Sequence, residues 1–245
     1  MVRAIVRLVI ALCLTIATAT AQDARPKVPP GRDPGGVAVA LISTGIDYTL
    51  PAIAARLARD GEGEIIAWDF ESDDNRPFDR SKGNSPAEWG GDVTAIASII
   101  LTEPGVRLIA VRIVQTDVVS IARAAAFLAQ TPARVAVVPM RSPRKQDWEP
   151  FAQAAANFKH VLFIAASNDG AEPSYPAALN LENVVAVPPS RVSAKSAGFG
   201  GVAQELSGPS LAVAAASRVA ATALARNPKL GIIELKRIVL ESAAR

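Results

Sequence analysis

From Val37 onward, short apolar runs alternate with longer segments whose apolar residues recur at helical spacing. The apolar runs predict β-strands, and the longer segments predict α-helices. A β–α alternation with nearly all-apolar strands is typical of a parallel sheet that helices cover on both faces. We therefore predict an α/β fold with a doubly wound parallel sheet in a three-layer α/β/α arrangement.

Residue ranges follow from the same pattern. The predicted strands are Val37–Ile42, Glu64–Trp68, Arg107–Val114, Arg134–Val138, Val161–Ala166 and Asn183–Val187. The predicted helices between them are Pro51–Arg59, Asp92–Leu101, Val118–Gln130 and Gln146–Phe158. Two more helices close the chain: Gly208–Arg226, apolar almost all round and so expected to be buried, and the amphipathic Leu230–Ala243. The polar segment Ser72–Glu88 predicts a long surface loop.

The N-terminal segment has the composition of a secretory signal peptide. Arg3 and Arg7 precede a short apolar run, and Ala19-Thr20-Ala21 provides an A-x-A cleavage site. We expect residues 1–21 to be removed, residues 22–36, which include four prolines, to form a flexible lead-in, and residues 37–245 to form one domain. The expected location is therefore periplasmic or extracellular, with no membrane span after removal of the signal.

Removal of the signal changes the charge and cysteine content. The chain has 26 Lys and Arg and 23 Asp and Glu, and two of the arginines lie in the signal. The mature net charge is then 24 − 23, or +1, which gives no support for a nucleic-acid partner. The single cysteine, Cys13, also leaves. The sequence contains no glycine motif for phosphate and no metal-ligand cluster, so we predict no cofactor and no metal.

Polar residues follow three predicted elements. Ser43-Thr44-Gly45 follows the first strand, Ser167-Asn168-Asp169-Gly170 follows the fifth, and Ser210 opens the buried helix. Ligands of open parallel sheets gather beyond the carboxyl ends of the strands. At one such edge, the amide of Asn168 and the N–H groups at the helix start could stabilise an oxyanion near Ser210.

Each motif also has an ordinary structural interpretation. Ser207 or Ser210 can simply cap a helix, and the Asn168 segment can be an ordinary turn. The order of the motifs along the chain, with matching secondary structure between them, favours the functional interpretation.

Four phrases in this order resemble the motifs of the subtilisin-like serine proteases. In LISTGID (41–47), Ser43 stands where that family has aspartate, and in GDVTAIASII (91–100), Asp92 stands where it has histidine. AASN (165–168) is similar to the asparagine motif with Asn168, and GPSLA (208–212) is similar to the serine motif with Ser210. The resemblance spans residues 37 to 243 and implies a subtilisin-like fold, Ser210 as nucleophile and Asn168 as oxyanion donor.

The same resemblance implies that two of the three catalytic residues are replaced. Where the family has a strand that pairs with substrate, this chain has PMRSP (139–143), and proline lacks the N–H that a bound peptide needs. The leading interpretation is a catalytically inactive homologue that binds a peptide or protein partner at the carboxyl edge of the strands.

Catalysis by Ser210 would need a base. The only histidine, His160, precedes the strand that leads to Asn168, so it lies on the order of 20 Å from the carboxyl edge. A carboxylate, Asp92 or Glu88, is the remaining base, although a free carboxyl has a pKa of about 4. Two alternatives stay open: an active serine endopeptidase with a carboxylate base, and a secreted α/β ligand-binding protein.

Overall fold

The computed structural model describes residues 26–79, 91–114, 117–170 and 172–243. Its centre is a sheet of six parallel strands in the order β2-β3-β1-β4-β5-β6. The strands are β1 (Val37–Ser43), β2 (Trp68–Asp69), β3 (Val106–Arg112), β4 (Val135–Val138), β5 (Leu162–Ala166) and β6 (Val184–Val187). The prediction of an α/β fold with a parallel sheet is confirmed.

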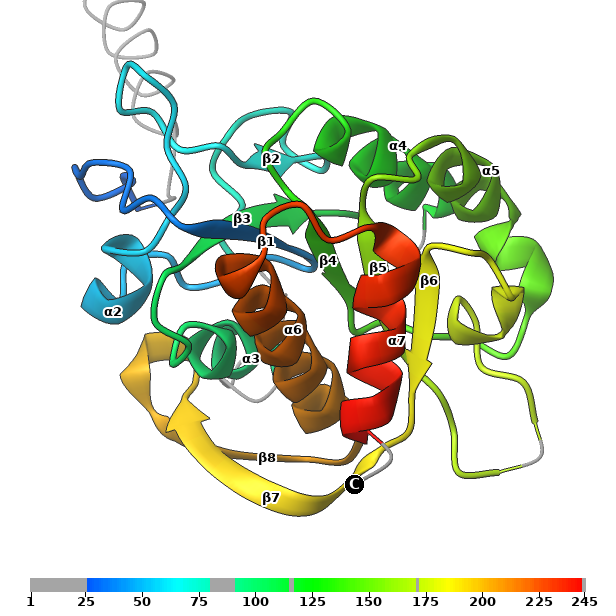
Figure 1. Cartoon of the computed structure of the whole chain (residues 1–245). Helices are drawn as coiled ribbons and strands as arrows, with labels where there is room; N and C mark the ends of the chain where they lie inside the picture. The colour runs from blue at the N-terminus through cyan, green and yellow to red at the C-terminus, as the bar shows by residue number, and fades with distance from the viewer. Residues whose placement is uncertain (1–25, 80–90, 115–116, 171, 244–245) are drawn as a thin grey trace, which may run out of the picture.

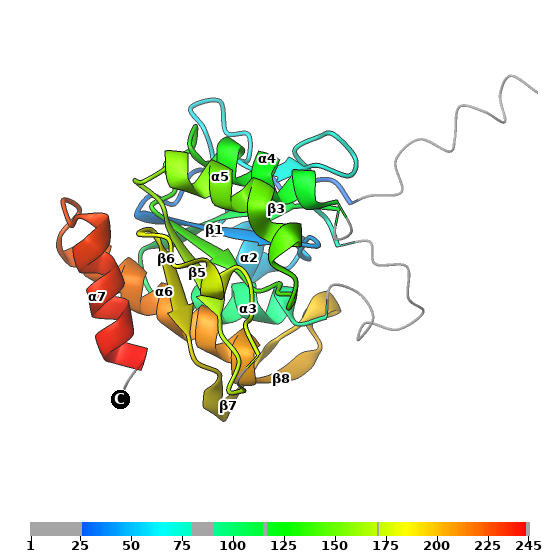
Figure 2. The ribbon, with the colours of Figure 1, turned by 90° about the vertical axis from the view of Figure 1, so that its right-hand side faces the viewer.

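Helices cover both faces of the sheet. α4 and α5 lie on one face, and α3, α6 and α7 lie on the other, so the molecule has three layers (Figures 1 and 2). The α-helices are α2 (Pro51–Ala54), α3 (Val93–Ile100), α4 (Val118–Leu128), α5 (Glu149–Asn157), α6 (Gly208–Arg226) and α7 (Ile232–Ala243). Three short 3₁₀ turns are η1 (Lys145–Trp148), η2 (Ala177–Leu179) and η3 (Phe199–Gly201).

The core consists of two apolar layers, one on each side of the sheet. Successive side chains of a strand point to opposite faces. In β1, Val39 and Leu41 therefore join the layer under α3 and α6, whereas Ala40 and Ile42 join the layer under α4 and α5. Because both faces are covered, the strand has no polar side, which explains its continuous apolar sequence.

Helix α6 is the central helix of its layer. Its buried side chains include Leu211, Val213 and Leu224, and it contacts β1, β4, β5, β6, α3 and α7. The expected burial is found along one side of the helix, where nine of its nineteen residues are buried. Among the described residues, α6 is also the one helix whose length and composition would allow it to cross a membrane, a test that a core helix passes equally well.

The first crossover differs from the prediction. Helix α2 ends at Ala54, because Ala58 N–H donates to the Leu108 carbonyl at 2.8 Å and Leu108 N–H donates to the Arg56 carbonyl at 2.8 Å. The chain thus leaves the helix to pair with β3. The strand predicted at Glu64–Trp68 is reduced to β2, which pairs with β3 over two residues.

A two-stranded antiparallel hairpin was not predicted. It consists of β7 (Ser190–Ala197) and β8 (Ala203–Ser207), joined through η3. β7 is attached to α3, since Ser98 Oγ donates to the Ala197 carbonyl at 2.7 Å and Ser196 Oγ donates to the Ala95 carbonyl at 3.2 Å. The hairpin runs along the end of the molecule where α3 and α6 begin (Figure 1).

Two segments outside the regular elements are attached to the body. Residues 26–36 form no helix or strand, but Asp33 accepts hydrogen bonds from Arg59 N–H at 2.7 Å and from Arg107 at 2.6 Å. In the loop after β2, Phe78 forms a bridge with Ile46. The predicted surface loop is thus partly held inward, and its remainder and the predicted signal peptide lie outside the described residues.

Candidate active site

Ser210 lies in the first turn of α6, after the N-cap residue Ser207 and next to Pro209. The Ser207 side chain makes no capping hydrogen bond. The hydroxyl of Ser210 donates to Asp92 Oδ2 at 2.6 Å. The interpretation of either serine as a simple helix cap therefore does not describe this site.

Asp92 is the N-cap residue of α3, and its carbonyl accepts the first helical bond, from Ile96 N–H at 2.8 Å. An aspartate at this position ordinarily caps the helix with its side chain. Here the side chain makes no capping bond. Its second oxygen, Oδ1, accepts from Gln204 Nε2 at 2.8 Å, so the carboxylate joins the start of α6 to the hairpin.

Gln204 on β8 completes a polar chain of three side chains, which we call the Ser210–Asp92–Gln204 chain. Glycine at position 198 allows this arrangement, because a Cβ there would lie 2.3 Å from Gln204 Oε1. Sequence reasoning missed Gln204, since no motif contains it. The glycine-rich stretch 198–201 was the signal for a turn that returns the chain toward α3.

Ser43 lies at the carboxyl end of β1 and is only 1% exposed. Its hydroxyl accepts a hydrogen bond from Gly45 N–H at 3.2 Å. Among the described residues it makes no hydrogen bond to Asp92. Gly45 has a φ of +110°, and a Cβ there would lie 2.8 Å from the backbone of Asp79, so the turn after β1 requires glycine.

A buried ion pair lies beside Ser43. Arg112, the register partner of Ser43 on β3, contacts Asp69 Oδ2 at 3.0 Å and donates to the Thr44 carbonyl at 2.9 Å. Arg112 also pairs with Glu71. The end of β1 where the resemblance expects a catalytic aspartate is therefore a buried cluster organised by an ion pair.

Asn168 is exposed in the loop after β5 and makes no hydrogen bond within the described part of the chain. The next residue, Asp169, lines a pocket together with Ala212, two residues beyond Ser210. The Asn168 loop and the first turns of α6 are therefore neighbours. The amide is free to bind a ligand, but it does not contact the Ser210–Asp92–Gln204 chain.

The other candidate bases are not at the site. His160 is exposed immediately before β5, at the end of that strand opposite to Asn168. Glu88 lies outside the described residues. Within the described ranges, no group of three or more His, Cys, Asp and Glu side chains is placed to hold a metal ion.

The segment that would pair with a substrate strand already has a partner. Ser142 N–H donates to the Tyr175 carbonyl at 3.1 Å, and Tyr175 N–H donates to the Ser142 carbonyl at 2.9 Å. Pro139 and Pro143 on either side have no N–H to donate. Both backbone groups of Ser142 are thus occupied within the chain.

Chemically, the site combines a hydroxyl at a helix N-terminus with a carboxylate acceptor. Backbone N–H groups at the start of α6 favour negative charge near Ser210. Asp92 orients the hydroxyl, but a carboxylate is a poorer general base at neutral pH than an imidazole. The arrangement can position a nucleophile or bind a polar group, and it lacks an imidazole to take a proton.

No known family model and no curated protein matches this chain in sequence. Solved structures match it in fold. A lanthipeptide protease has a TM-score of 0.63 at 17% identity, with 84% of this chain and 80% of that chain covered. The A-subunit of the AB5 toxin from E. coli has a TM-score of 0.65 at 17% identity, with coverage of 85% and 84%. A cold-adapted subtilisin-like serine proteinase has a TM-score of 0.52 at 16% identity, with coverage of 88% and 84%.

Proposed function

We propose that this chain, which has a subtilisin-like fold, does not hydrolyse peptides at neutral pH and acts as a binding or scaffolding domain outside the cytoplasm. The observation that carries the proposal is the Ser210–Asp92–Gln204 chain, in which a carboxylate is the partner of the hydroxyl.

The weakness of this base is the first support. A serine hydroxyl attacks only when a neighbouring group takes its proton, and the effective bases have a pKa near the working pH. An ordinary aspartate has a pKa of about 3.9. Loss of matched general-base catalysis costs about a hundred- to ten-thousandfold in rate.

The surroundings of the site give the second support. Ser43 is buried, its hydroxyl accepts from its own turn, and within the described residues it makes no hydrogen bond to Asp92. The backbone groups of Ser142 are occupied by Tyr175, which removes a place where an extended peptide would pair. Productive catalysis needs a substrate held in a fixed geometry as well as a nucleophile.

Export of the chain rests on residues 1–21, whose charged start, apolar run and small cleavage residues fit a signal peptide. The proposed partner is a peptide or protein that binds at the carboxyl edge of the strands. The exposed, unbonded side chain of Asn168 offers both a donor and an acceptor at that edge.

Incubation of the purified mature protein with a proteome-derived peptide library, followed by mass spectrometry, tests the proposal. At neutral pH we expect the wild type and Ser210→Ala to give the same cleavage products at the same low level. Cleavage by the wild type that disappears in Ser210→Ala would contradict the inactive assignment.

A second candidate function is a serine peptidase that uses Asp92 as its base. The short Ser210–Asp92 hydrogen bond favours it, because nucleophile and base are already within the distance that proton transfer needs. This function predicts library cleavage that is lost in both Ser210→Ala and Asp92→Asn. Equal products from all three proteins at acidic and neutral pH would exclude it.

A further inference from the structure

A pocket of about 550 Å³, which none of Ser210, Asp92 and Gln204 lines, lies between α6, the end of α7 and the connection from β6 to β7. This volume is within the range of small-molecule sites in proteins. Its walls come from four separate parts of the chain, because Asp169 of the loop after β5 also lines it.

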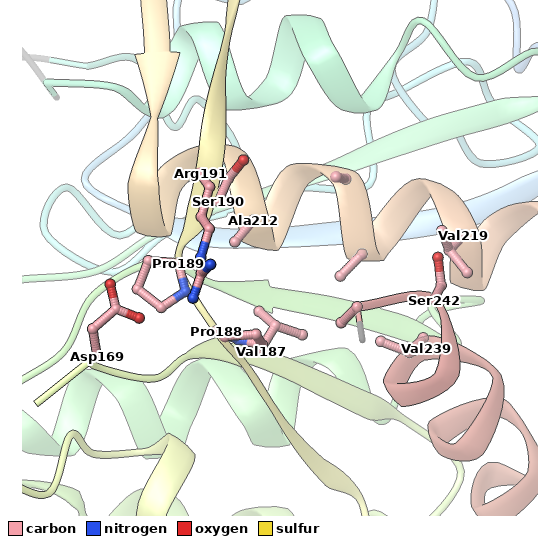
Figure 3. A pocket seen from close by; sticks show the side chains of 13 residues that line it. Asp169, Val187, Pro188, Pro189, Ser190, Arg191, Ala212, Val219, Val239 and Ser242 are labelled. Carbon is pink, nitrogen blue, oxygen red and sulfur yellow. The ribbon is translucent and has the colours of Figure 1, made fainter. Parts of the chain in front are cut away.

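The walls of the pocket are mostly apolar. Val187 and Pro188 lie on one side, and Val219 of α6 and Val239 of α7 lie together at one end (Figure 3). The small side chains of α6 are what leave the space open. Such a surface fits a branched aliphatic group.

Two of the thirteen lining residues are charged, and they have opposite signs. Arg191 and Asp169 both lie at the end of the pocket away from Val219 and Val239 (Figure 3). Within the described part of the chain, neither makes an ion pair or a side-chain hydrogen bond. Arg191 is exposed on β7 and Asp169 is exposed after β5, so both can bind a ligand.

We infer that this pocket binds a small zwitterion of the aliphatic α-amino acid class. The guanidinium of Arg191 would bind the ligand carboxylate through its planar pair of donors, and Asp169 would bind the ligand ammonium. The branched side chain would enter the apolar part of the pocket. A ligand that has only a carboxylate would leave Asp169 without a partner, or would place two negative charges side by side. A ligand that has only an ammonium would do the same to Arg191 with positive charges.

The inference does not depend on the fate of Ser210. None of Ser210, Asp92 and Gln204 lines the pocket. A binding role at the pocket and the presence or absence of hydrolysis at Ser210 can therefore be tested separately.

The test measures binding of three matched probes to the mature protein by calorimetry. L-Leucine carries both charges, 4-methylpentanoate lacks the ammonium, and 3-methylbutylamine lacks the carboxylate. We expect leucine to bind about ten- to a hundredfold more tightly than either single-charge probe, because each charged hydrogen bond contributes about that factor. Absence of leucine binding at millimolar concentration, or equal binding of all three probes, would overturn the inference.

Three variants test the assigned residues. Arg191→Gln should weaken leucine and 4-methylpentanoate about ten- to a hundredfold, whereas Asp169→Asn should weaken leucine and leave 4-methylpentanoate unchanged or tighter. Ala215→Trp, at an exposed position that lines the pocket, should block every probe. Lys195→Gln, the control at an exposed cation of β7 that does not line the pocket, should bind as the wild type does. Leucine affinity that all three variants preserve would contradict the site.

Discussion

Two polar clusters lie toward the carboxyl end of the sheet, and they differ in burial and in charge. The Ser43 cluster is inside the protein: Ser43 is 1% exposed, Asp69 is fully buried, and Arg112 neutralises it at 3.0 Å. The Ser210–Asp92–Gln204 chain is partly exposed. Within the described residues its carboxylate has hydrogen-bond donors but no cation.

This difference separates structural from functional polar groups. A buried charge pair is strongly destabilising when one partner is removed, so the Ser43 cluster is tied to folding. A half-exposed carboxylate keeps contact with water, so substitutions there should change chemistry more than stability. Positions 43 and 92, which a catalytic relay would couple, belong here to clusters with different roles.

The largest expected effect is on the reactivity of Ser210, and it comes from substitutions that couple position 43 to position 92. The double variant Ser43→Asp/Asp92→His places a carboxylate and an imidazole at the two replaced positions. If the backbone still has the catalytic geometry, the reactivity of Ser210 should rise about a hundred- to ten-thousandfold at neutral pH. The rate of acylation by a chromogenic ester, followed in a stopped-flow instrument, measures this gain.

Asp92→His alone is the matched control and should gain less, because nothing then orients the imidazole. Equal gains from the single and double variants would show that position 43 is not coupled to the site. No gain from a folded double variant would mean that the fold no longer holds the catalytic geometry.

Arg112→Leu tests the structural cluster. Arg112 is buried, and its removal breaks the buried ion pair with Asp69, so we expect the free energy of unfolding to fall by about 3–5 kcal/mol. Urea denaturation measures the change. Arg144→Leu is the control, since its pair with Asp147 is exposed and should contribute less than about 1 kcal/mol. Equal losses in both variants would remove the distinction between the clusters.

Asp33 provides a measure of acid stability that is independent of both clusters. Burial raises the pKa of Asp33, but hydrogen bonds from Arg59 and Gly35 N–H groups and the Arg107 guanidinium outweigh burial and lower the pKa below its ordinary value. A lowered folded-state pKa contributes stability above the unfolded value of about 3.9, and this contribution is lost as the pH falls.

Asp33→Asn should therefore lower the free energy of unfolding by about 2 kcal/mol at neutral pH. The difference from the wild type should shrink as the solution is acidified below about pH 4. Urea denaturation at several pH values measures both. A difference that grows on acidification would contradict the assigned contacts, and the same series gives the acid limit for activity assays.

The smallest expected change in stability is that of Asp92→Asn. The new amide can still accept from Ser210, but its NH₂ group then faces the Gln204 donor, so one hydrogen bond is lost. We expect a decrease of about 1 kcal/mol or less in the free energy of unfolding. Thermal unfolding measures it. A loss as large as that of Arg112→Leu would place Asp92 among the structural residues.

Most of the fold follows from the sequence, because apolar strands and amphipathic helices impose distinct periods. The exceptions have local causes. The helix predicted over Pro51–Arg59 ends at Ala54, because Arg56 and Ala58 form backbone hydrogen bonds with Leu108 of β3. The spacing of apolar residues along the sequence does not reveal this tertiary contact. The hairpin β7–β8 was missed because most of its residues are exposed and its two strands have no continuous apolar pattern.

Only those residues of the site that lie within the four motifs could be predicted from the sequence. The resemblance placed Ser210 and Asp92 in one site, and the structure brings them into hydrogen-bond contact. It could not place Gln204, which reaches Asp92 through a turn that depends on Gly198. It also grouped Ser43 with the site, whereas burial and the neighbouring Arg112 give that residue a structural environment.

Labelling of the mature wild type with a fluorophosphonate probe tests most directly whether Ser210 has an effective base. At neutral pH the account predicts labelling no faster than in Ser210→Ala, because the carboxylate partner cannot activate the hydroxyl. Rapid labelling that maps to Ser210 and disappears in Ser210→Ala would contradict the account and identify a working serine hydrolase.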